Sequence, residues 1–174
     1  MSYRTREQLI ADFHALEILY PNLVSHEVFG KSYQGRDTIL FKIGNPYGGR
    51  VMFDGSSHGN ERLGSEICYF YAKWLLERTE LAAERILERN LTLLVPIVNV
   101  DGFPNHRKNM NFESPRVDGV DLNRNFDWNW DGVATTGGGV SDDPISNVYR
   151  GPYAESESES RVYRQLWAKY KPKH

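Results

Sequence analysis

The chain has 174 residues, 40% of them hydrophobic and 25% charged, a balance that is typical of one globular domain over residues 1–174. With 21 Lys and Arg against 23 Asp and Glu, the net charge is −2, so there is no positive excess to bind nucleic acid or an anionic membrane. No apolar run is long enough to cross a bilayer, the first residues lack the apolar core of a secretory signal, and Cys68 is the single cysteine. We therefore expect no intramolecular disulfide, no nucleic-acid or membrane partner, and a cytoplasmic location.

The first third of the chain predicts a helix followed by strands. Apolar residues three and four positions apart indicate an amphipathic surface helix over residues 5–20, ended by a proline. Two β-type runs, residues 23–29 and 38–43, flank a turn-rich segment and predict a hairpin. Residues 50–53 open a third strand. The apolar stripe of the helix consists of Leu9, Phe13, Leu16 and Tyr20.

The middle of the chain has the order of a βαβ unit. The spacing of apolar residues predicts a core-facing helix over residues 61–77. A charged helical segment, residues 80–88, leads to residues 91–98, which are apolar almost throughout, as in a strand buried on both faces. The predicted fold class is α/β, a mixed sheet of about four strands flanked by helices. The predicted core-facing residues of the first helix are Leu63, Ile67, Phe70 and Trp74.

The last third begins with a long polar region. Residues 99–153 are rich in Asn, Asp, Gly, Pro and Arg and have almost no periodicity, and compact domains rarely carry such a loop without a functional reason. We expect it to be ordered beside a site. Residues 155–170 return to a helical pattern. The expected anchors of the loop are Phe103, Phe112, Phe126, Trp128 and Trp130, and those of the final helix are Val162, Leu166 and Tyr170.

Two histidines are followed three residues later by a glutamate, and their contexts differ. His14 and Glu17 lie on the solvated flank of the first predicted helix, where surface polarity explains them. His58 and Glu61 lie on either side of a turn from a buried strand into a helix, at the strand end where open α/β sheets place ligands. An imidazole and a carboxylate that converge there suit zinc. The alternative is a helix cap or a hydrogen-bonded turn.

A second cluster lies in the long loop. Residues 119–126 place Asn123 beside Arg124, and a planar guanidinium next to an amide suits recognition of a carboxylate. The alternative is a structural arginine that pairs with Asp121 or Asp127. A short basic run, residues 106–109, fits either a cation near developing negative charge or a solvated loop.

Three further residues favour structural interpretations. Cys68 lies in a helix with no neighbouring base and is expected to be a packed thiol rather than a nucleophile. Asp101 is expected to order its loop through an Asx-type turn with Gly102. Glu157 is expected to cap the final helix.

Several of these segments together resemble the zinc metallocarboxypeptidase family of the carboxypeptidase A and B type. The resemblance implies a carboxypeptidase-like (phosphorylase/hydrolase-like) fold, Zn²⁺ as cofactor, and hydrolysis of C-terminal residues from peptides with a free carboxylate. It also implies that His58 and Glu61 are the first two zinc ligands, and that Arg107 stabilises the oxyanion. Asn123 and Arg124 are implied to bind the C-terminal carboxylate of the substrate. The matching segments are residues 30–36, 58–61, 99–103, 107–109, 119–126 and 149–157.

The same resemblance places a third zinc ligand, a histidine at the end of a further strand, and a glutamate general base beyond His174. We therefore expect the N-terminal portion of a truncated catalytic domain, with no appreciable activity of this chain by itself and with His174 not a ligand. Residues 91–98 are then expected to lie beside an unpaired edge, which favours self-association. Two other functions stay open: an N-acyl amino acid amidohydrolase of a related group, and a non-catalytic carboxylate-binding fragment.

Overall fold

The computed structural model describes residues 3–111, 119–132 and 139–172, so Phe112 and His174 lie outside the described residues. None of the described helices is both long enough and apolar enough to span a membrane. The helices are α1 (Arg6–Leu19), α2 (Leu63–Glu77), α3 (Leu81–Arg89) and α4 (Ser158–Tyr170), and the strands are β1 (Val24–Lys31), β2 (Asp37–Gly44), β3 (Gly49–Asp54) and β4 (Asn90–Val95).

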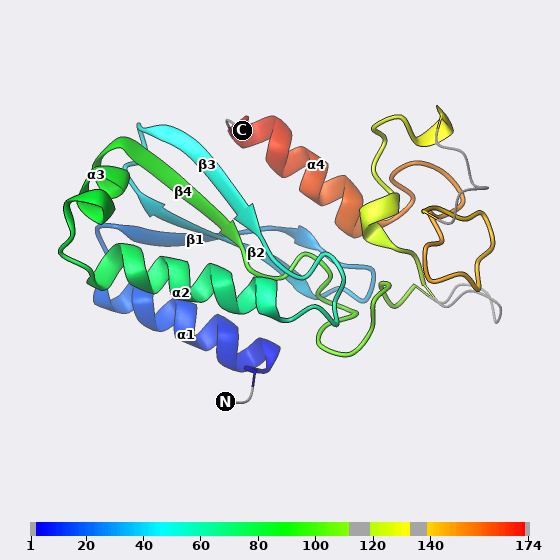
Figure 1. The fold of residues 1–174 in the computed structure, drawn as a ribbon, viewed down its shortest axis with the longest axis horizontal. Coiled ribbons are helices and arrows are strands. Elements are labelled where there is room, and N and C mark those ends of the chain that lie inside the picture. Colours follow the sequence, from blue (N-terminus) through cyan, green and yellow to red (C-terminus); the bar gives the residue numbers. More distant parts are fainter. Residues whose placement is uncertain (1–2, 112–118, 133–138, 173–174) are drawn as a thin grey trace.

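The four strands form one mixed sheet in the order β1-β2-β4-β3 (Figure 1). β1 and β2 form the predicted antiparallel hairpin, β2 pairs antiparallel with β4, and β3 runs parallel to β4. The predicted fold class is confirmed. Because β4 lies between β2 and β3, the expectation of an unpaired edge beside it is wrong, and the outer edge on this side of the described sheet belongs to β3.

Helices cover both faces of the sheet. α1 and α2 run side by side along one face, and α4 lies on the opposite face (Figure 1). The alternation of side chains along a strand divides β2 and β4 between two cores: Phe41 and Leu94 join the α1 and α2 side, while Leu40 and Leu93 join the α4 side. β3 and β4 run parallel and in register, so both strands end at the same edge of the sheet, at Asp54 and Val95.

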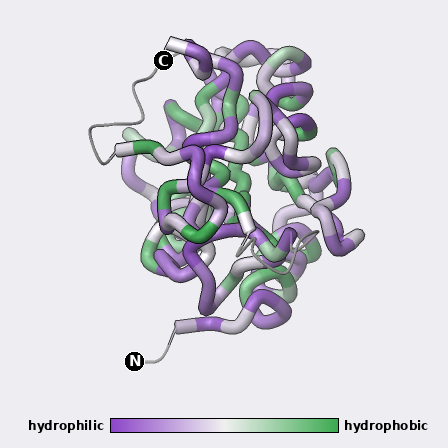
Figure 2. The backbone as a smooth tube through the Cα atoms, turned by 90° about the vertical axis from the view of Figure 1, so that its right-hand side faces the viewer, coloured by the Kyte–Doolittle hydropathy of each residue, from purple (hydrophilic) through white to green (hydrophobic). Residues whose placement is uncertain are grey.

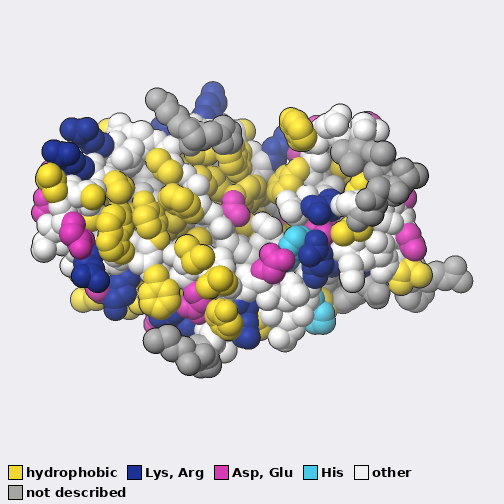
Figure 3. Space-filling view, in the orientation of Figure 1, with side chains coloured by type: hydrophobic (Ala, Val, Ile, Leu, Met, Phe, Trp, Pro, Cys, Tyr) yellow, Lys and Arg dark blue, Asp and Glu magenta, His cyan; other side chains and the backbone are white. Residues whose placement is uncertain are grey.

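The face that α2 buries differs from the predicted one at three of the four positions, since only Trp74 of the predicted set packs, partly buried, against the core. Leu63, Ile67 and Phe70 are 58%, 57% and 52% exposed. The buried residues of the helix are instead Ser65, Glu66, Cys68, Tyr69, Ala72 and Leu75. Exposed hydrophobic side chains, Phe53 of β3 among them, gather over the β3 side of the sheet (Figure 3).

The region after β4 is irregular, as predicted, with only two single-turn 3₁₀ helices among its described residues, η1 (Leu122–Arg124) and η2 (Trp130–Gly132). Its end of the molecule faces the viewer in Figure 2, where hydrophilic stretches alternate with shorter hydrophobic ones. Phe103 is buried as expected, but Trp128 is 88% exposed and does not anchor the loop. α4 begins at Ser158 rather than at residue 155, because Glu157 is in extended conformation.

The ring of Phe13 on α1 stacks on Phe41 of β2 with 4.4 Å between ring centroids, and both side chains are fully buried. Phe13→Ala should lower the free energy of unfolding by about 3–5 kcal/mol, because it leaves a ring-sized cavity between helix and sheet. Ile18→Ala, on the same helix at a position that is 79% exposed, should change it by only about 0.5 kcal/mol. Urea denaturation of both variants measures the difference, and equal losses would contradict the packing described.

Candidate metal and carboxylate site

The turn from β3 into α2 is held in an unusual backbone path. Ser56 has a φ of 51°, in the left-handed region, and its hydroxyl donates to the carbonyl of Glu61 at 3.0 Å. A Cβ on Gly59 would lie 2.5–2.6 Å from backbone atoms of Gly102, Phe103 and His106. Glycine is therefore required by the close approach of the segment that follows β4.

This turn brings His58 and Glu61 together, as predicted. His58 Nδ1 lies 3.0 Å from Glu61 Oε1, and the imidazole is buried while the carboxylate is largely exposed. The other ring nitrogen, Nε2, lies 3.1 Å from Oδ1 of Asp121. A proton on Nε2 leaves a lone pair on Nδ1 facing the Glu61 carboxylate. Nδ1 and Oε1 then both carry lone pairs, and they can lie this close only with a proton or a metal ion between them.

The residue that sequence reasoning missed is Asp121. Its carboxylate is fully buried and accepts hydrogen bonds from His58, from Arg107 Nη2 at 3.0 Å and from the backbone N–H of Asn123 at 3.1 Å. The sequence feature that pointed to it was a carboxylate two residues before Asn123 in an otherwise polar loop. The sequence analysis considered only Arg124 as an ion-pair partner for Asp121. The structure pairs Asp121 with Arg107 instead.

Arg107 is the member of the basic run that reaches the site. Besides its bond to Asp121, its Nε donates to the carbonyl of Asn147 at 3.2 Å, and its Nη1 lies 3.9 Å from Glu61 Oε1. Lys108 and Asn109 are buried in structural roles: the Lys108 ammonium donates to two loop carbonyls, and Asn109 donates to Glu157. A guanidinium therefore borders the His58 and Glu61 pair.

Asn123 and Arg124 lie in the single-turn helix η1, which Asp121 caps. Asn123 is exposed, and Arg124 is half-buried. Among the described residues, Arg124 Nε donates to the carbonyl of Gly139 at 2.5 Å and Nη1 to that of Asn123 at 3.3 Å, not to Asp121 or Asp127. The structural ion pair considered from the sequence is thus not formed, and the guanidinium still has donors to offer.

The three residues expected to be structural are buried, although two use other contacts than predicted. Asp101 accepts from Ser32, Gln34 and Arg36 in the β1–β2 turn, while Asn99, not Asp101, accepts from the N–H of Gly102. Glu157 sits at the N-cap of α4 but makes no capping bond, since its carboxylate accepts from the side chains of Asn109, Asn111 and Ser156. Burial raises the pKa of Cys68 to about 12, with the Asp54 charge adding to the effect, as expected of an inert packed thiol.

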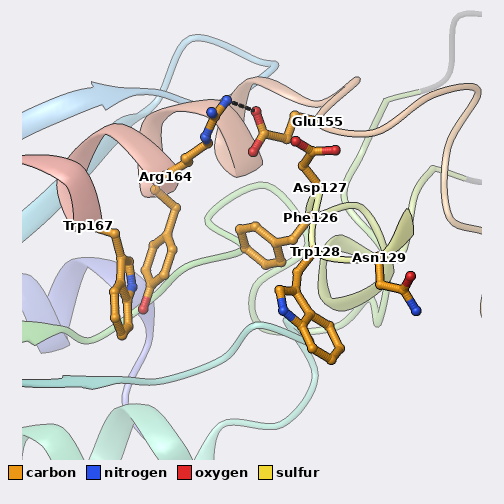
Figure 4. Close-up of a pocket in the computed structure, with 8 residues that line it drawn as sticks. Phe126, Asp127, Trp128, Asn129, Glu155, Arg164 and Trp167 are labelled. Carbon is orange, nitrogen blue, oxygen red and sulfur yellow. Dashed lines mark hydrogen bonds and ion pairs between the residues drawn. The ribbon is translucent and has the colours of Figure 1, made fainter. Parts of the chain in front are cut away.

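A separate hollow of about 620 Å³ lies between the loop and α4. Figure 4 shows Phe126 and Trp128 on the loop side and Trp167 and Arg164 on the α4 side, with Arg164 paired to Glu155 at 2.9 Å. Its lining contains none of the predicted site residues. Phe126 thus helps to shape this hollow rather than the His58 site.

The charge of Asp121 should matter to stability in the absence of any ligand. Asp121→Asn preserves the shape of the side chain but removes the ion pair with Arg107 and weakens the hydrogen bond from His58. We expect the free energy of unfolding to fall by about 1.5–3 kcal/mol, as for hydrogen bonds to charged groups. Asp142→Asn, which breaks the exposed pair with Arg150, should cost less than about 1 kcal/mol. Urea unfolding in chelator-containing buffer compares the two, and a similar small effect of both would refute the importance given to Asp121.

Comparison with known proteins shows the family to which the chain belongs. A family model described as zinc carboxypeptidase matches residues 9–173. Carboxypeptidase B of Astacus astacus is 30% identical over 97% of this chain and 57% of its own length, and carboxypeptidase A6 of Mus musculus is 29% identical over 97% and 40%. The crystal structure of carboxypeptidase A from Helicoverpa armigera superposes with a TM-score of 0.83 at 26% identity, over 97% of this chain and 43% of that one.

The fold alone is also shared with thrombin-activatable fibrinolysis inhibitor, whose crystal structure gives a TM-score of 0.86 at 23% identity over 97% of this chain and 44% of that one. The chain spans about half the length of the curated relatives it matches. The match extends nonetheless through both cores, the strand-end turn and the loop that carries Asp121. The chain belongs to the zinc carboxypeptidase family, whose cofactor is Zn²⁺.

Proposed function

We propose that this chain supplies one part of a carboxypeptidase active site, the part that binds zinc through His58 and Glu61 and the substrate's C-terminal carboxylate through Asn123 and Arg124. The observation that supports it is the convergence on Asp121: the imidazole, the Arg107 guanidinium and the backbone of the η1 helix all donate to one buried carboxylate. The substrates would be peptides with a free C-terminus.

The donor set at His58 and Glu61 suits zinc. A histidine whose far nitrogen donates to a carboxylate is a common arrangement for zinc ligands, because that bond sets the tautomer and the ring orientation. His58 meets this condition through Asp121. Zinc held here would lower the pKa of a bound water and polarise a carbonyl oxygen.

The remaining roles follow from charge and position. Arg107, beside Glu61, would stabilise negative charge that develops on the scissile carbonyl oxygen. Arg124 and Asn123 would hold the terminal carboxylate and so fix which peptide bond is presented. The backbone of η1 and the His58 imidazole both donate to Asp121. The position of the residues that would bind the substrate carboxylate is therefore coupled to the position of the proposed metal ligand.

Hydrolysis needs groups beyond these. Among the described residues, no third His, Cys, Asp or Glu donor converges on His58 and Glu61. Glu61 cannot act as general base if it is a ligand, because its carboxylate is then committed to the ion. We therefore propose that a third ligand and a general base come from outside the described residues.

The carboxylate role is tested by Arg124→Gln. Binding of an N-acylated dipeptide with a free C-terminus to the zinc-loaded chain should weaken by about tenfold to a hundredfold, the effect of a lost charge-assisted hydrogen bond. Binding of the matching C-terminal amide should change little. Arg164→Gln, on α4 and paired with Glu155, is the control. Chemical-shift titration measures both affinities, and the same loss for acid and amide would exclude the role.

The zinc-loaded chain of 174 residues should release no measurable C-terminal amino acid. A general base alone contributes about 10²- to 10⁴-fold, and two protein ligands hold zinc weakly. Amino-acid release from a peptide measures this, with a longer chain of the same protein family as positive control. Robust, chelator-sensitive release that His58→Ala abolishes would show that the described residues already complete the site.

A further inference from the structure

Three side chains of types that can ligate a metal ion lie together at the β1 edge of the sheet, opposite the β3 edge. His14 and Glu17, one turn apart on α1, meet His26 of β1, and we call these three residues the α1–β1 triad. His26 Nδ1 lies 3.0 and 2.8 Å from the two Glu17 carboxylate oxygens, and His14 Nδ1 lies 3.2 Å from Oε2. One donor atom from each residue lies within 4.8 Å of the others, the only such convergence of three donors among the described residues.

The triad is presented by rigid elements. Its two imidazole rings contact each other edge to face, with 4.6 Å between centroids, and both contact the buried ring of Phe41, at 5.5 and 6.1 Å. His26 is the cross-strand partner of Phe41 in the β1–β2 ladder, and Phe41 stacks on Phe13 of α1. Contacts through Phe41 thus hold α1 against the sheet next to the three ligand side chains.

The triad is distinct from the His58 site. β1 is at one edge of the sheet and β3, which leads to His58, is at the other, with β2 and β4 between them. The sequence explained His14 and Glu17 as a solvated helix flank, and the structure adds what spacing could not show, a second imidazole from a different element. All three side chains are only partly exposed, at 37%, 27% and 38%.

The donor chemistry selects a class of ion. Two imidazoles and one carboxylate are ligands for zinc-class divalent metals, with bonds of about 2.0–2.2 Å, so donor atoms around one ion lie roughly 3–3.5 Å apart. The two histidine-to-carboxylate distances of 3.2 and 2.8 Å are already near this spacing. The two imidazole donors lie within 4.8 Å of each other and would have to close by at most about 1.3–1.8 Å, which a change of side-chain rotamer can supply. Partial burial acts to raise the pKa of Glu17, but hydrogen bonds from His14 and His26 lower it overall, so the carboxylate is ionised at neutral pH.

We propose that His14, Glu17 and His26 form a second, structural site for a zinc-class divalent ion that joins α1 to β1, with water completing the coordination. The ion takes the place of the protons that now bridge each imidazole Nδ1 to Glu17, and these protons move to Nε2 or to solvent. Because the three ligands come from two elements, α1 and β1, the site exists only in the folded chain, and the bound ion stabilises the fold by linkage.

The experiment measures Co²⁺ and Zn²⁺ binding to four proteins: wild type, His58→Ala, the double variant His14→Gln/His26→Gln, and His106→Gln as an exposed-histidine control. Isothermal titration gives affinity, and the Co²⁺ absorption spectrum reports nitrogen ligation. We expect the double variant to lose at least about tenfold in affinity at the α1–β1 site, since even the loss of a residue that hydrogen-bonds to a metal ligand costs about that much. We expect His58→Ala and His106→Gln to retain the α1–β1 binding.

Thermal unfolding supplies a second readout. At about a hundredfold excess over Kd, Zn²⁺ should raise Tm by roughly 5–10 °C in wild type and in His58→Ala, but not in the double variant. Glu17→Gln, which keeps shape and hydrogen-bonding capacity, should remove most of the shift even if the double variant folds poorly. Unchanged affinity and Tm shift in both triad variants would overturn the inference. Loss of binding only in His58→Ala would overturn it too, while supporting the proposed catalytic zinc site.

Discussion

The buried carboxylate of Asp121 is the interaction on which the candidate site depends. A carboxylate removed from water costs several kcal/mol unless it is paired and hydrogen-bonded, and Asp121 meets that condition only when three segments are in place together: the turn after β3, the loop after β4, and η1. The same bonds orient the imidazole, restrain the guanidinium and position the helical turn. The contacts that form the site are therefore also contacts that hold the loop region, and they join Asp121 to residues 2, 14 and 63 positions away.

Local periodicity was enough to predict most elements. The stripe from Leu9 to Leu16, the β1–β2 hairpin and the apolar run in β4 were all read correctly, because each element meets the core with a pattern of its own. α2 shows the limit. It is apolar on two sides, and spacing favoured the larger residues at positions 63, 67 and 70, whereas the side with Cys68 and Ala72 is the one that is buried.

Contacts between distant positions were not predictable. The strand-end location of His58 and Glu61 could be inferred because parallel strands share an edge. Nothing in the local sequence shows that Asp121 accepts a hydrogen bond from His58. Nor does it show that Asp101 accepts hydrogen bonds from the β1–β2 turn, 65 to 69 positions away. A polar loop offers many carboxylates and many donors, and only the path of the backbone decides which ones meet. The same holds for His26, whose partners on α1 are set by how the helix lies across the sheet.

The close approach at Gly59 limits how this site can vary over evolution. Three backbone atoms of the neighbouring segment occupy the space of any Cβ, so every substitution there displaces main chain rather than a rotatable side chain. A compensating mutation cannot make room either, because mutation changes side chains and leaves the backbone atoms in place. Changes in the surroundings of the candidate site must therefore come from side chains on neighbouring segments, while the backbone of the turn that carries His58 and Glu61 stays the same.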